Sequence, residues 1–256
     1  MTTLVRVGAF RRRLLARELL VGTFLKTPSA AVAEILGLSG LDCMCVDAEH
    51  APFDRAALDM VLLAARAHDL PSLVRVANAE AASVLNSLDL GATGVVLPHV
   101  TSADTAARIA GACRYGREGR GYAGSTRAAG YTTRTMANII ADANASVCVL
   151  AQIEDAAALP QVDAIAAVDG IDCLFVGRMD LTVSLGADSP DDPVVVDAVR
   201  QICAAARRHD RCVGMFTPSI AEAALWRSEG VSFFLLGSDQ QWILKGAREL
   251  AAAFRP

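Results

Sequence analysis

The sequence predicts an α/β protein built as a (β/α)₈ TIM barrel. Short apolar runs of strand length alternate eight times with longer amphipathic stretches, which is the pattern of repeated strand–helix units. The chain has 256 residues, close to the roughly 250 residues of one such barrel. No break in composition interrupts the repeat, so we expect a single domain over residues 1–256.

The expected strands are unbroken apolar runs, as suits a parallel sheet that is buried on both faces. They cover residues 19–25, 43–48, 72–77, 94–100, 147–154, 173–177, 212–217 and 233–238. Helices are expected between them. Asp54 and Ser102 are suited to cap the helices that follow the second and fourth strands, and Pro193 fits the first turn of the helix after the sixth.

One connection is unusually long. Residues 116–133, GREGRGYAGSTRAAGYTT, join the fourth and fifth units. A long loop in a compact barrel is typically functional, and the alternative is a flexible surface excursion. The loops after the strands lack the G-x-G-x-x-G pattern, which argues against a dinucleotide site.

Composition excludes several classes of protein. The net charge is -4 and no basic stripe is present, so nucleic-acid binding is not expected. No run reaches the ~18 apolar residues of a membrane span, and charged residues interrupt the N-terminal apolar stretch where a signal peptide would need continuity. We expect a soluble cytoplasmic protein whose cysteines are reduced and buried: Cys43, Cys45, Cys113, Cys148, Cys173, Cys203 and Cys212.

Polar residues follow the predicted strands where a TIM barrel carries its catalytic groups. Glu154, after the fifth strand, and Asp180, after the sixth, are the candidate metal ligands, because Mg²⁺ and Mn²⁺ prefer carboxylate oxygens and keep positions open for substrate. A 2-oxo acid offers a carboxylate and a keto oxygen to such an ion. The alternative is a pair of acids that cap the next helices.

Three further residues carry candidate chemistry. His50 is the expected general base, oriented by Asp47 or Glu49, with His99 as the weaker alternative. Arg75 lies in an apolar strand, where it can stabilise an enolate or form an internal ion pair. Lys26 at the end of the first strand keeps a Schiff-base mechanism open.

Six motifs resemble the HpcH/HpaI family of class II 2-oxo-acid aldolases, and they occur in the family's order over most of the chain. They are VDAEHAP (46–52), LVRV (73–76), SLDLGATGVVLPHV (87–100), EGRGYAGSTRA (118–128), LAQIED (150–155) and VGRMDLTVSLG (176–186). The chain is similar in this respect to 4-hydroxy-2-oxoheptanedioate aldolase and to 2-dehydro-3-deoxyglucarate and rhamnonate aldolases.

The resemblance implies a role for each matching residue. His50 corresponds to the base helped by Asp47, Asp89 to the acid that raises its basicity, and Arg75 to the enolate-stabilising arginine. The metal ligands correspond to Glu154 and Asp180, and the ion to Mg²⁺ or Mn²⁺, with Co²⁺ also suitable. The expected substrate contacts are Gln152, Gly177, Met179, Asp180 and Arg120.

The implied activity is reversible cleavage of a 4-hydroxy-2-oxo acid to pyruvate, or a related 2-oxo acid, and an aldehyde. The alternatives are a CoA-ester lyase resembling the citrate lyase β chain and a non-catalytic 2-oxo-acid-binding protein. The resemblance also implies a homo-oligomer, dimer-based or hexameric, whose last helix is exchanged between partners.

The chain departs from the family pattern at Arg178 and Met179, where many members have Pro and Ala. Together with Arg120 and Arg127 of the long loop, Arg178 is expected over the barrel mouth, where guanidinium groups favour carboxylates. We therefore expect an aldehyde partner with an acid or several hydroxyl groups. The alternative is that each of these arginines is solvated at the edge of the barrel mouth.

Overall fold

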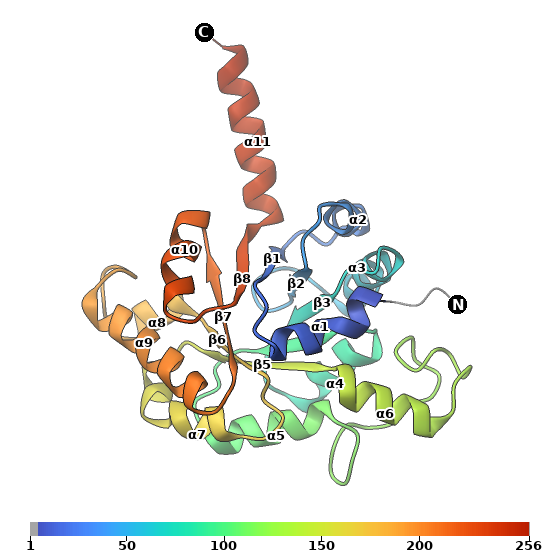
Figure 1. The fold of residues 1–256 in the computed structure, drawn as a ribbon. Helices are drawn as coiled ribbons and strands as arrows, with labels where there is room; N and C mark the ends of the chain where they lie inside the picture. The colour runs from blue at the N-terminus through green and yellow to red at the C-terminus, as the bar shows by residue number, and fades with distance from the viewer. Residues whose placement is uncertain (1–4, 256) are drawn as a thin grey trace.

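The computed structural model describes residues 5–255 as a closed barrel of eight parallel strands, β1 to β8 in sequence order (Figure 1). The strands are β1 Leu20–Leu25, β2 Cys43–Asp47, β3 Ser72–Arg75, β4 Gly94–Leu97, β5 Cys148–Ile153, β6 Cys173–Val176, β7 Cys212–Thr217 and β8 Phe233–Ser238. Every predicted strand is present, and the predicted TIM barrel is confirmed.

Helices surround the barrel. They are α1 Val5–Leu15, α2 Ala30–Leu38, α3 Arg55–Ala67, α4 Ala81–Asp89, α5 Ala103–Cys113, α6 Met136–Ser146, the 3₁₀ helix η1 Ala156–Gln161, α7 Val162–Ala167, α8 Arg178–Ser184, α9 Pro193–Arg208, α10 Ile220–Ser228 and α11 Asp239–Phe254. The predicted caps are confirmed, because Asp54 accepts from Ala57 and Ser102 from Thr105.

The inside of the barrel is a separate apolar cluster from the layer between strands and helices. Five cysteines lie in it, Cys43, Cys45, Cys148, Cys173 and Cys212, and all seven cysteines are buried, as predicted. The helix α1, which the sequence reading did not anticipate, adds Phe10 and Leu14 to this cluster. The Phe10 ring meets Phe233 edge-on at 6.2 Å between centroids, so α1 closes one end of the barrel.

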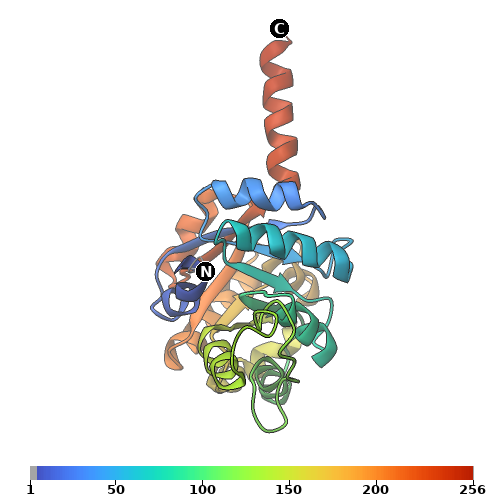
Figure 2. The same ribbon diagram turned by 90° about the vertical axis from the view of Figure 1, so that its right-hand side faces the viewer.

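The last helix stands away from the rest of the chain in both views (Figures 1 and 2). Only Asp239, at its start, is buried. The Asp239 carboxylate accepts the backbone N–H groups of Lys26 at 2.7 Å and Thr27 at 3.1 Å, which fixes the base of α11 to the end of β1. Among residues 5–255, no helix combines the length and apolar character needed to cross a membrane.

Candidate active site

A cavity of about 270 Å³ opens at the carboxyl ends of the strands. It is lined by Phe24, Lys26, His50, Arg75, Gln152, Phe175, Gly177, Arg178, Met179, Asp180, Phe216 and Ser238. Eight of the residues singled out from the sequence are in this set: Lys26, His50, Arg75, Gln152, Gly177, Arg178, Met179 and Asp180. The barrel therefore brings them together from five strand ends that lie far apart in the sequence.

Arg75 and Asp47 form a buried ion pair below this cavity, because the register of β2 on β3 sets them side by side. The Arg75 Nε and Nη2 atoms donate to the two Asp47 oxygens at 3.1 and 2.8 Å. Lys26 Nζ lies 3.0 Å from Asp47 Oδ2, and the Arg75 guanidinium stacks 4.8 Å above the Phe24 ring. Burial raises the pKa of Asp47, but the hydrogen bonds and charge of Arg75, the His50 N–H and Lys26 together hold this pKa below its ordinary value.

This pair leaves part of Arg75 available to a ligand. The hydrogen bonds to Asp47 use Nε and Nη2, and within residues 5–255 Arg75 Nη1 has no hydrogen-bond partner. Arg75 lines the cavity, so a fixed positive charge with a free N–H edge faces the space where substrate would lie. Arg75 therefore forms an internal ion pair and also faces the substrate space, where it can stabilise an enolate. These are the two roles that the sequence left open.

His50 is positioned through its backbone. Its N–H donates to Asp47 Oδ1 at 3.1 Å, while its imidazole is half exposed, with Nε2 3.6 Å from Glu49 Oε2. Of the two acids expected to orient the ring, Glu49 is the one beside it. Asp47 instead fixes the turn that carries His50.

Asp89 and Arg120 do not line the cavity at the carboxyl ends of the strands. Asp89 is the last residue of α4, which leads to the start of β4, so it lies at the opposite end of the barrel from His50. Its carboxylate pairs with Arg120 at 2.6 Å. Arg120 lines a second cavity, of about 620 Å³. Within this chain, Asp89 therefore does not act on His50, and Arg120 does not reach the mouth.

Arg127 was also expected over the barrel mouth, but it does not line the mouth cavity. It pairs instead with Asp59 at 2.8 Å. Arg178 does line the mouth cavity, but its guanidinium lies 2.5 Å from Glu222 and stacks on Trp226 at 5.6 Å. Burial raises the pKa of Glu222 although Arg178 acts to lower it. The charge of Arg178 is thus largely used in joining α8 to α10.

Glu154 is held in a close-fitting pocket of polar groups. It is 2% exposed, Gln152 Nε2 donates to its Oε2, and His99 N donates to its Oε1 at 2.9 Å. Gly177 is required beside it, because a Cβ at that position would lie 2.7 Å from Glu154 Oε2. Burial and the nearby Glu49 raise the pKa of Glu154 above its ordinary value.

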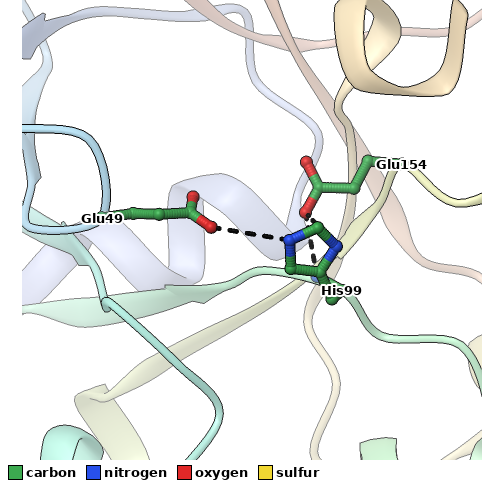
Figure 3. Close-up of side chains that lie close together, drawn as sticks. All are labelled: Glu49, His99 and Glu154. Atoms are coloured by element: carbon green, nitrogen blue, oxygen red, sulfur yellow. Dashed lines mark hydrogen bonds and ion pairs between the residues drawn. The ribbon is translucent and has the colours of Figure 1, made fainter. Parts of the chain in front are cut away.

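Glu154 belongs to a group of three side chains that could hold a metal ion. Glu49, His99 and Glu154 each offer one ligand atom, and these atoms lie within 4.8 Å of one another (Figure 3). Asp180, in the first turn of α8, is exposed and faces the same cavity. The sequence predicted Glu154 and Asp180 as ligands, Glu49 as a residue that orients His50, and His99 as the alternative base; it did not predict Glu49 or His99 as ligands.

The site fits a cation on two observations. Gln152 is 1% exposed, and its Oε1 has no hydrogen-bond partner within the described residues. The carboxylates of Glu49 and Glu154 lie close together, and Glu49 Oε2 lies 3.3 Å from Arg75 Nε. A buried oxygen without a partner beside two carboxylates favours a hard divalent ion.

Comparison with known proteins identifies similar sequences over most of the chain. The model of the HpcH/HpaI aldolase/citrate lyase family matches residues 20–245. The hydroxypyruvate/pyruvate aldolase of Paraburkholderia phytofirmans is 38% identical over 93% of this chain and 94% of its own. The 4-hydroxy-2-oxovalerate aldolase of Rhodococcus jostii is 34% identical over 97% and 96%.

A solved structure has a similar fold. The crystal structure of an HpcH/HpaI aldolase/citrate lyase family protein from Burkholderia cenocepacia superposes with a TM-score of 0.92 at 34% identity, covering 97% of this chain and all of that one. The motifs, the barrel and these matches converge, and the chain belongs to the HpcH/HpaI aldolase/citrate lyase family.

Proposed function

We propose that this protein is a divalent-metal-dependent aldolase that reversibly cleaves a 4-hydroxy-2-oxo acid to pyruvate, or a related 2-oxo acid, and an aldehyde. The observation that carries the proposal is one cavity that joins His50, Arg75 and Asp180 with the buried Glu154 beneath Gly177. Relatives named pyruvate and 4-hydroxy-2-oxovalerate aldolases support it.

Glu154 and Asp180 would hold the ion, with Mg²⁺, Mn²⁺ or Co²⁺ compatible with two carboxylates. When bound, the ion acts as a Lewis acid that polarises the keto oxygen of the substrate. Gln152 fixes the Glu154 carboxylate through its amide N–H. The Gln152 carbonyl oxygen, which has no partner in the described chain, remains to contact a water or a hydroxyl group.

Arg75 would face the oxygen on which negative charge develops. It cannot turn away, because two hydrogen bonds to Asp47 and the Phe24 ring hold its guanidinium. A donor fixed in advance stabilises a developing oxyanion without reorganisation. Asp47 is therefore a positioning residue for both Arg75 and the His50 turn.

His50 would take the proton of the substrate's 4-hydroxyl group. The O–H electron pair becomes the second bond of the aldehyde carbonyl, the C3–C4 bond breaks, and its electrons pass to the enolate of pyruvate. Protonation of C3 then releases pyruvate. His50 suits this role because its ring is accessible at the cavity and Glu49 Oε2 lies 3.6 Å from Nε2.

The imine route through Lys26 is the mechanistic alternative. Lys26 lines the cavity, but its Nζ lies 3.0 Å from the buried Asp47 carboxylate. Attack of Lys26 on a keto carbon would therefore require the loss of this ion pair. The geometry therefore favours the metal route.

We further propose that α11 packs on a partner subunit. Ile243, Ala247, Leu250 and Phe254 follow one helical face, and Phe254 is 88% exposed. A contiguous apolar stripe in water is characteristic of an interface. Leu250→Glu should therefore lower the oligomeric state in light scattering, while Lys245→Gln on another face should leave it unchanged.

The test of function is pyruvate release from a panel of 4-hydroxy-2-oxo acids, with metal and after exhaustive chelation. We expect cleavage only with metal, and loss of cleavage in Glu154→Gln and Asp180→Asn. Arg200→Met, which alters a surface ion pair with Glu229, is the control and should retain cleavage. Full activity of chelated protein would refute the metal-dependent mechanism.

A further inference from the structure

A second and larger cavity lies at the amino ends of the strands, away from the barrel mouth. Its volume is about 620 Å³, and its walls come from the start of α1, the ends of α3 and α6, and the long loop. Thr93 and Val147, which precede β4 and β5, also line it. Of residues 5–255, none lines both cavities. A ligand held here would therefore not compete with substrate at the mouth.

Arginines predominate among the charged residues of this cavity. Arg66, Arg120 and Arg134 line it, and the acid among its lining residues is Asp142. Arg134 pairs with Asp142, so these two charges offset each other. Arg66 is exposed in the last turn of α3 and forms no ion pair within residues 5–255. The walls of the cavity therefore carry an excess of positive charge.

Arg120 is held in place with part of its guanidinium unused. The residue is 6% exposed, its Nη2 donates to Asp89 Oδ1 at 2.6 Å, and its guanidinium stacks 4.8 Å from the centre of the Tyr115 ring. Its Nε is buried and has no hydrogen-bond partner within residues 5–255. Buried donors are almost always paired, and an unpaired donor on a charged group is costly. The free Nε therefore indicates a place for an acceptor that the chain itself does not supply.

We propose that this cavity binds a small organic anion, whose phosphate or carboxylate oxygens accept hydrogen bonds from Arg66 and Arg120. The planar guanidinium donates to two oxygens at once, a geometry that suits both groups. The cavity has more than twice the volume of the mouth cavity and falls within the roughly 300 to 1,000 Å³ of small-molecule sites. An organic phosphate or a dicarboxylate therefore fits both its charge and its size.

The test measures binding of glycerol 3-phosphate and of malonate by calorimetry. Native protein should bind at least one of them, and the tighter of the two shows whether phosphate or carboxylate is the preferred group. Arg66→Gln and Arg120→Lys should each weaken that binding by about 10-fold or more, as expected for the loss of a charged hydrogen bond. Arg66 has no ion pair to lose, and Arg120→Lys keeps a positive charge beside Asp89, so both variants should fold.

Arg227→Gln is the matched control for the change in net charge. Arg227 is likewise an exposed arginine in the last turn of a helix, α10, but it does not line this cavity, so its variant should bind both anions as the native protein does. The proposal would be overturned if native protein bound neither anion, or if both cavity variants bound with native affinity. A loss in Arg227→Gln as large as that in Arg66→Gln would also overturn it, because the effect would then come from net charge alone.

Discussion

Arg75→Met removes the guanidinium that the proposed mechanism needs and leaves Asp47 buried, with no exposed surface. Losing one partner of a buried ion pair typically costs about 3 to 5 kcal/mol. Lys26 Nζ remains 3.0 Å from the Asp47 carboxylate, so we expect a loss near the lower end. For a chain of this size each kcal/mol lowers Tm by about 2 to 4 °C, which predicts a fall of roughly 6 to 12 °C.

The same substitution should slow enolisation, because it removes a fixed oxyanion donor worth about 10² to 10³ in rate. Thermal melting followed by circular dichroism measures the first effect, and deuterium exchange of the pyruvate methyl group measures the second. The double variant Asp47→Asn with Arg75→Met should recover much of the stability but none of the exchange. A melting temperature and an exchange rate both equal to the native values would refute the reasoning.

Two further perturbations test the packing of the site and the core. Gly177→Ala would set a Cβ 2.7 Å from Glu154 Oε2, so metal binding should weaken by about 10- to 100-fold. The control is Gly111→Ala, where a Cβ meets nothing within 4 Å, and it should bind metal as the native protein does. Equal metal affinities of the two variants would contradict the account of Gly177. Burial raises the pKa of Cys45 and Cys113 to about 12, which keeps them as unreactive thiols at pH 8. Native protein should therefore react with Ellman's reagent far more slowly than unfolded protein, in which all seven cysteines are free, and equal rates would show that the barrel interior is open.

The strands were predictable because a parallel barrel buries both faces of every strand, which leaves a run of apolar residues in the sequence. The helix α1 was not predictable, because its arginines interrupt the apolar pattern around Phe10 and Leu14. These two residues belong to the apolar cluster inside the barrel. That contact depends on Phe233, more than 200 residues away. The role of α1 in covering one end of the barrel is therefore seen only once the barrel has formed.

The site was predictable as a set of strand-end residues but not as a set of contacts. Asp47 and Arg75 are neighbours because of strand register, which no local pattern specifies. Asp89 was expected, from its motif, to act on the base, yet it is the last residue of α4 and lies at the opposite end of the barrel from His50. The sequence placed His99 at the end of the fourth strand. It did not predict the left-handed backbone conformation that sets His99 beside Glu154.

The central claim is that a divalent ion and Arg75, rather than an imine on Lys26, stabilise the enolate of pyruvate. The most direct measurement is deuterium incorporation into the methyl group of pyruvate by native protein in D₂O, with metal, after chelation, and with borohydride added. The account predicts exchange that stops on chelation, returns with Mn²⁺ or Co²⁺, and leaves no borohydride adduct on Lys26. Exchange that persists after complete chelation, with pyruvate trapped on Lys26, would contradict it.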